Sequence, residues 1–180
     1  MAGIVRADTF RMNTIKSQDS DMTAATIDAN GYMFPRLPHF LIRNTSAQSI
    51  PNATYTRAEF NNTVLDTHSF SDLANNKIVF NSTTAGVYQV NFGGKVNNVS
   101  AARVGYWLRK EGVMNTGPYL AYFEMEADAS SYAYPTFSFI HKFESDEFLE
   151  LDMYHTHGSA LNTYPQSQAI GFFMSGVRIG

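Results

Sequence analysis

Cysteine is absent from the 180-residue chain. Disulfide bonds, thiolate metal sites, iron–sulfur clusters and cysteine nucleophiles are therefore excluded together. Charged residues are also scarce, at 16% of the chain where ordinary soluble domains have about 25%. The formal net charge is −3 and no run of Lys or Arg occurs, so the sequence predicts binding neither to nucleic acid nor to an anionic membrane surface.

Long apolar segments and catalytic motifs are lacking as well. No apolar run approaches the roughly 20 residues that span a membrane, and the N-terminus has no apolar segment of signal-peptide length. The glycine-rich motifs of nucleotide-binding proteins and the Gly-x-Ser-x-Gly motif of hydrolases do not occur. We therefore expect a chain that is not inserted in a membrane, is not an enzyme and holds no cofactor.

Aromatic residues are plentiful, with 14 Phe and 10 Tyr, and Asn, Ser and Thr replace the missing charges. This composition favours short strands joined by turns. Many short segments alternate between apolar and polar residues, and the best helical candidate, residues 69–76, is long enough only for a turn or a short 3₁₀ helix. The sequence predicts an all-β protein, an antiparallel sandwich or jelly roll. The strands are expected at residues 39–43, 53–60, 76–80, 86–92, 103–110, 134–141, 147–154 and 171–179.

The chain divides in sequence into residues 1–36 and residues 37–180. The first part has few apolar residues and one hairpin signal, Asn30-Gly31, between two extended segments. These short strands bury too little to fold alone, so we expect an extended N-terminal arm that becomes ordered against a partner subunit or a larger assembly. The alternative is a disordered tail. The residues expected to anchor the arm are Ile15, Ile27, Asn30, Gly31 and Phe34.

Two groups of residues have spacings that occur in metal sites. His155 and His157 would share one face of a strand, but two histidines without a third ligand do not make a zinc site. One histidine from each of three subunits on a threefold axis would supply three ligands. Glu124, Glu126 and Asp128 also alternate, as calcium ligands often do, although a solvated strand face is the commoner meaning of such a pattern. The sequence therefore predicts no metal, with His155 and His157 as weak candidates.

The order of several motifs resembles the complement globular-head and tumour-necrosis-factor-like superfamily over residues 38–180. The matching segments are residues 38–40, 56–61, 78–88, 108–112 and 172–177, which include the Gly-x-Tyr opening of a strand at Gly86 and a closing Phe-x-Gly-type strand. Two positions depart from the family pattern: Asp146-Glu147 stands where Gly-Asp is usual, and Glu111 stands where Asn is usual.

This resemblance implies a jelly roll that forms compact homotrimers about a threefold axis, with aromatic faces packed between subunits. A large number of aromatic side chains in one domain is consistent with either an aromatic core or a buried interface. The residues expected in the core or the trimer interface are Phe40, Phe60, Phe80, Tyr88, Phe92, Trp107, Phe172 and Phe173.

The N-terminal part resembles the leader of bacteriophage virion proteins that present a jelly roll, through Thr14-Ile15 and residues 22–35. This implies a structural protein on the surface of the virion. Its partners would be the other two chains of a homotrimer and a major capsid protein or a tail or neck protein. As a capsid decoration it would cement the head, and as a short tail fibre it would contact a host cell-surface glycan or protein.

Exposed aromatic loops are expected at Tyr119, Tyr132 and Tyr134, where a fibre tip would bind its receptor. The alternative function is a soluble ligand-binding or carbohydrate-binding jelly-roll module, in which exposed Tyr and Trp stack on sugars. Trp107 would be the platform of such a module, but its place between Tyr106 and Leu108 in an apolar strand favours burial.

Overall fold

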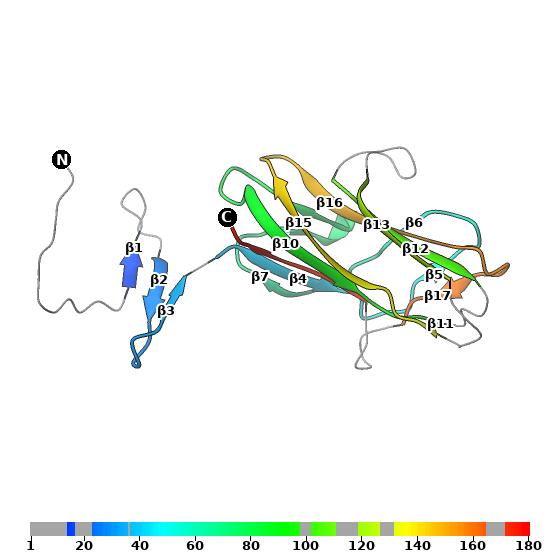
Figure 1. The fold of residues 1–180 in the computed structure, drawn as a ribbon, viewed down its shortest axis with the longest axis horizontal. Coiled ribbons are helices and arrows are strands. Elements are labelled where there is room, and N and C mark those ends of the chain that lie inside the picture. The colour runs from blue at the N-terminus through cyan, green and yellow to red at the C-terminus, as the bar shows by residue number, and fades with distance from the viewer. Residues whose placement is uncertain are drawn as a thin grey trace, which may run out of the picture. The chain divides into compact units, whose positions relative to one another are not determined.

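The computed structural model of the protein describes residues 14–16, 23–35, 37–97, 102–110, 119–126, 132–164 and 172–180 (Figure 1). The chain forms two compact units, residues 1–37 and residues 38–180. Regular structure in the described parts is β, apart from a 3₁₀ helix, η1 (Leu73–Asn75), inside the segment where the sequence predicts a short turn. None of the helical structure in these residues is long and apolar enough to cross a membrane.

The first unit is a three-stranded antiparallel sheet in the order β1 (Thr14–Lys16), β2 (Thr23–Ile27) and β3 (Met33–Pro35). The hairpin between β2 and β3 turns at Asn30 and Gly31. The Asp28 carboxylate accepts hydrogen bonds from the backbone N–H groups of Asn30 and Tyr32, each 2.9 Å long. Gly31 has φ +85°, a conformation that suits glycine. The pairing of β1 with β2 adds a third strand to the hairpin that the sequence predicts.

The second unit is a sandwich of two antiparallel sheets, shown in Figure 1. The five-stranded sheet has the order β15 (Thr136–Phe143), β10 (Gly86–Gly93), β18 (Phe173–Arg178), β4 (His39–Arg43) and β7 (Asn62–Asp66). The six-stranded sheet has the order β13 (Tyr119–Glu126), β12 (Arg103–Arg109), β16 (Phe148–His155), β9 (Lys77–Val79) and β8 (Ser71–Asp72), with β6 (Thr56–Arg57) also paired to β16. The strands that neighbour each other are mostly distant in sequence, as a jelly roll requires. The predicted all-β, antiparallel jelly-roll class is confirmed.

Two short ladders extend the sandwich. They join β11 (Val96–Asn97) to β14 (Tyr132–Ala133) and β17 (Leu161–Asn162) to β5 (Ser49–Ile50). An isolated bridge between Val96 and Thr163 connects the two ladders. These short pairings satisfy backbone groups of the connecting segments, which would otherwise be buried without hydrogen bonds.

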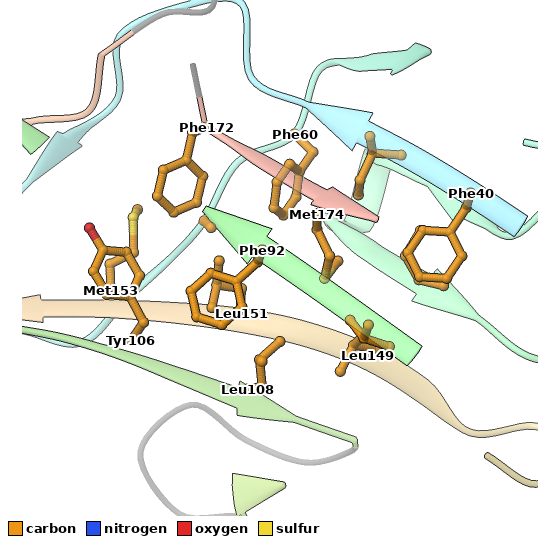
Figure 2. Close-up of a cluster of buried hydrophobic side chains, with 14 of the residues drawn as sticks. Phe40, Phe60, Phe92, Tyr106, Leu108, Leu149, Leu151, Met153, Phe172 and Met174 are labelled. Atoms are coloured by element: carbon orange, nitrogen blue, oxygen red, sulfur yellow. The ribbon is translucent and has the colours of Figure 1, made fainter. Parts of the chain in front are cut away.

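Side chains alternate across each sheet and fill the space between the two sheets. On β10, Tyr88, Val90 and Phe92 are fully buried, while Gln89 points to the other face and is exposed. Figure 2 shows such inward side chains from both sheets pointing toward one another. The core is strongly aromatic: the rings of Phe80 and Phe143 stack with centroids 4.0 Å apart. Removing rings of this size from water is the main stabilising contribution of a core.

The turn before β16 keeps its shape although it lacks the glycine of the family pattern. Asp146 has φ +70°, in the left-handed region, and its backbone N–H donates to the carbonyl of Phe80 at 2.9 Å. Asp tolerates this region better than most residues. Glu111, the second departure from the pattern, lies outside the described residues.

Two expectations about strands were wrong in extent. Residues 53–60 contain only the two-residue strand β6, and residues 119–126, where no strand was expected, form the eight-residue strand β13. The β12–β13 pairing shifts register between Leu108 and Arg109. The bulge disturbs the alternation only at the start of β13, and residues 121–126 alternate regularly between the two faces of the sheet.

Candidate functional site

The outward face of the six-stranded sheet carries a cluster of aromatic side chains. Val104, Tyr106 and Leu108 of β12 are buried in the core, so Trp107 between them points away from it. Four tyrosines of neighbouring strands lie on the same side of the sheet. We call this group the outer aromatic face: Tyr55, Trp107, Tyr119, Tyr122 and Tyr154.

Trp107 is the centre of this face and is buried by tyrosine rings. The Tyr55 ring meets it edge-on with centroids 4.9 Å apart, and the Tyr154 ring is perpendicular to it at 5.9 Å. Tyr119 approaches from β13 at 6.4 Å. Tyr122 pairs with Trp107 across β12 and β13 but is 67% exposed. Trp107 is only 5% exposed, so Tyr122 is the ring of this face most open to solvent.

Gly105 makes room for Trp107. It lies two residues before Trp107 on the same face of β12, and a Cβ atom there would overlap Cη2 and Cζ3 of the indole. The indole therefore lies close against the backbone of its own strand, over Gly105. Any larger residue at position 105 must displace the indole.

A buried network of charges holds β6 on the sheet beside the aromatic rings. Arg109 and Asp152 have fully buried side chains and form an ion pair of 2.6 Å between Nη2 and Oδ2. Arg57 of β6 donates from Nε to Oδ1 of Asp152 at 3.0 Å and from Nη1 to Glu150. Burial raises the pKa of Glu150 above its ordinary value, although Arg57 and Arg109 act in the opposite direction. Removing one member of such a network leaves a buried charge, which is costly.

The network positions Tyr55, which comes two residues before Arg57. Burial, together with Tyr119, Tyr154 and Glu124, raises the pKa of Tyr55 above its ordinary value, and Arg103 opposes this shift. Arg103 and Glu124 form an ion pair on adjacent strands, with side chains 51% and 28% exposed. The outer aromatic face thus has a rigid aromatic centre and a polar rim.

A second feature lies along the open side of the sandwich, between the edge strands β13 and β15. Inward side chains are fully buried on the inner strands, whereas several of those on these two edge strands are only half-buried. The rings of Phe123 and Phe137 stack with centroids 6.1 Å apart. We call these half-buried residues the edge seam: Leu120, Phe123, Met125, Phe137 and Phe139.

The outward face of the five-stranded sheet adjoins this seam. Ile140 of β15 is 64% exposed, and Leu65 of β7 is 44% exposed. The three middle strands of this sheet are β10, β18 and β4, and their outward positions carry one formally charged side chain, Arg43. Its Nε donates a hydrogen bond to Oδ1 of Asn62 at 2.7 Å. A low-charge face with exposed aliphatic side chains is suited to contact with protein.

The residues predicted for the core or the trimer interface fall in three places. Phe173 is half-buried on the outward face of the five-stranded sheet, and Trp107 is buried in the outer aromatic face. The other six lie in the core between the sheets: Phe40, Phe60, Phe80, Tyr88, Phe92 and Phe172.

The predicted binding loops are partly strands. Tyr119 is the first residue of β13 and is half-buried, so its placement in an exposed loop was wrong. Tyr132 lies in β14. Tyr134 is 46% exposed, with Nζ of Lys95 lying 5.8 Å from its ring centroid and 3.9 Å from that of Tyr164. Residues 117 and 118 of the predicted loop lie outside the described residues.

The weak metal candidates do not converge. Nε2 of His155 lies 2.8 Å from the carbonyl oxygen of Ile50, so this nitrogen carries the hydrogen, and Nδ1 accepts from the backbone N–H of His157 at 3.3 Å. Both ring nitrogens of His155 are therefore occupied. Within the part of the chain that the structure describes, no three His, Asp or Glu side chains form a metal-binding group. Asp128 lies outside that part.

The predicted anchor residues lie in the N-terminal unit. Ile27 ends β2 and is half-buried, while Asn30 and Gly31 are exposed in the hairpin turn. Ile15 belongs to β1 and Phe34 to β3.

Solved structures with this arrangement are known. Murine APRIL shares 12% identity with this chain at a TM-score of 0.60, covering 80% of this chain and 100% of APRIL. The globular domain of zebrafish complement 1qA protein shares 11% identity at a TM-score of 0.56, and the match covers 79% of this chain and 98% of that domain. Eiger TNF from S. frugiperda shares 8% identity at a TM-score of 0.57, and the match covers 80% of this chain and 93% of Eiger TNF. No protein-family model and no curated protein matches the sequence. The chain thus has a TNF/C1q-like jelly-roll fold.

We predict that Gly105→Ala displaces Trp107. The added methyl group overlaps the indole, so the ring must move toward solvent, and overpacking of this kind costs about 1–3 kcal/mol. Tryptophan emission should shift to longer wavelength, and urea unfolding should show the loss of stability. The control is Gly180→Ala, whose Cβ would make ordinary contacts with Val87. An unchanged emission spectrum in Gly105→Ala contradicts the placement of Trp107.

We also predict that acid destabilises the fold through two histidines, the buried His155 and the half-buried His141. Burial lowers the pKa of His155 and of His141 below the ordinary value of 6.5. As the pH falls below 6.5, these histidines become protonated in the unfolded chain before they do so in the folded chain. The free energy of unfolding therefore decreases until the pH passes the folded-state pKa. The decrease is at most about 1.4 kcal/mol per pH unit for each histidine.

His155→Gln tests this contribution. The glutamine amide keeps a donor for the carbonyl of Ile50 but has no proton to gain. Urea unfolding between pH 8 and pH 5 should show a shallower loss of stability in the variant than in the native protein. Equal slopes in the two proteins contradict the prediction.

Proposed function

We propose that this protein is a non-enzymatic structural protein of a bacteriophage virion, built as a homotrimer of the jelly roll and attached to the particle by its N-terminal unit. The observation that carries the proposal is the edge seam. It leaves half-buried aromatic side chains along one side of an otherwise closed core. Apolar surface of this kind marks a protein interface.

A cyclic arrangement of three chains covers the seam. The edge seam and Ile140 of one chain would pack on the outward, low-charge face of the five-stranded sheet of the next chain. Such a contact joins two different surfaces, and it forms a closed ring when the rotation between subunits is one third of a turn. The family resemblance of residues 38–180 supports a ring of three.

The chemistry of the chain supports binding over catalysis. In the described residues, the buried side chains of Arg109, Glu150 and Asp152 and the half-buried side chain of Arg57 form one network that joins β6, β12 and β16. These charged side chains therefore stabilise the contacts between strands. The outward faces, by contrast, offer large aromatic and aliphatic surfaces for partners.

The attachment to a particle is supported by the leader pattern of residues 22–35 and by the separate N-terminal sheet. That sheet has three short strands and buries little apolar surface of its own. Three such units joined through one trimer would bind a repeating particle surface far more firmly than one, because the later contacts form at high effective concentration. The attachment site is either the head, as a capsid decoration, or the tail or neck, as a short fibre.

We predict that Ile140→Glu converts the trimer to a monomer. Ile140 is 64% exposed in the single chain, so the charge leaves the monomer fold intact but places a carboxylate in the interface. Sedimentation velocity should give the mass of one chain, with an unchanged circular dichroism spectrum. Tyr122→Glu, at a position of similar exposure on the outer aromatic face, should remain trimeric. A trimeric Ile140→Glu protein would place the interface elsewhere.

We predict that deletion of residues 1–35 separates assembly from attachment. The truncated protein should remain a folded trimer, because the jelly roll begins at residue 38. It should no longer co-sediment with phage particles that lack the native protein, whereas the full-length chain does. Retained particle binding by the truncated trimer would show that the N-terminal unit is not the anchor.

A further inference from the structure

The two outward faces of the sandwich differ in their chemistry. The face of the five-stranded sheet carries aliphatic side chains, among them Leu41, Leu65, Ile140 and Val177. On β12, β13 and β16 the outward positions are aromatic, charged or glycine. They are Arg103, Gly105, Trp107, Arg109, Tyr119, Tyr122, Glu124, Glu126, Phe148, Glu150, Asp152 and Tyr154. The proposed trimer contact uses the first face and leaves the second uncovered.

Protein interfaces commonly combine aromatic residues with methionine and other apolar side chains. Aliphatic residues are missing from the outward positions of these three strands. What remains is a set of flat rings next to hydrogen-bonding groups. This is the chemistry that recognises a sugar, because one face of a pyranose ring presents C–H groups to the negative face of an aromatic ring. Its hydroxyl groups then bond to carboxylate and guanidinium groups at the rim.

The geometry provides both parts of such a site within a short distance. Tyr122 is exposed and has few rotatable bonds, so little conformational entropy is lost when a ligand stacks on it. Glu124 lies two residues along the same strand and therefore on the same face. Its ion pair with Arg103 of β12 holds the two planar groups together on this face, and Glu124 is the next outward residue after Tyr122 on β13. Glu124 and Arg103 balance each other, and the exposed Glu126 beyond them adds one negative charge, so the rim suits a neutral ligand better than an anionic one.

We infer that the outer aromatic face binds a neutral pyranose chain, with Tyr122 as the stacking ring and Arg103 and Glu124 as the hydroxyl-binding rim. Trp107 and Tyr55 form the rigid support beneath this surface. Every residue of this site belongs to one jelly roll, so sugar binding requires neither the trimer nor the virion.

The site contains its own reporter, because Trp107 is the one tryptophan of the chain. The full-length protein is titrated with three hexasaccharides, of β-1,4-linked N-acetylglucosamine, β-1,4-linked glucose and α-1,4-linked glucose. Tryptophan emission and titration calorimetry are followed together. We expect saturable binding of at least one hexasaccharide, and a loss of about tenfold or more in affinity in Tyr122→Ala.

Tyr32→Ala is the matched control. Tyr32 is exposed to the same 67% but lies in the N-terminal unit, so its removal should leave the affinity unchanged. The Ile140→Glu variant should also bind the sugar as the native protein does, whatever its oligomeric state, which separates a failure of this inference from a failure of the trimer.

Two results would overturn the inference. The first is the absence of saturable binding of all three hexasaccharides by both methods. The second is equal affinity of Tyr122→Ala and Tyr32→Ala. If Tyr122→Ala no longer binds phage particles and the native protein binds none of the sugars, the outer aromatic face is a protein contact and the sugar site is excluded.

Discussion

In the described residues, the core is fully buried at its centre but only half-buried along the edge strands β13 and β15, and the rest of the structure depends on this incomplete burial. Inward side chains of β10 and β12, such as Tyr88 and Tyr106, are fully buried. Their counterparts on the edge strands, such as Phe123 and Phe137, are not. Half-buried apolar side chains along a sheet edge are a surface on which a partner chain can pack, and the proposed trimer uses it. The low charge of the adjoining sheet face fits a second copy of the same chain.

The opposite face of the molecule depends on two local solutions. Gly105 lets the indole of Trp107 lie against the strand, and the buried ion network around Asp152 holds β6 so that Tyr55 closes over the indole. Both are costly arrangements, because a glycine weakens a strand and buried charges lose hydration. Their combined result is a stiff aromatic surface with one open ring, Tyr122. That surface is separate from the one that trimerisation would use.

Much of the fold could be predicted because alternation within a strand is local. The pattern around Tyr88 and Val90 identifies β10 and its buried face directly. The site could not be predicted in the same way. Trp107 is flanked by Tyr106 and Leu108, so an apolar run conceals which of the three points outward. Tyr55 meets Trp107 only through the pairing of β6 with β16, which no spacing in the sequence reveals. Tyr119 was placed in a loop because Gly117 and Pro118 precede it, and the regular alternation of residues 121–126 was not recognised as a strand.

The most direct test of the central claim is the solution mass of the full-length chain by light scattering. We expect a mass of about three times the 20.1 kDa of one chain, because a ring of three gives the edge seam of every subunit a neighbour. A stable monomer of 20.1 kDa would contradict it, since the seam would then be tolerated in water and nothing would link the N-terminal units into one multivalent anchor.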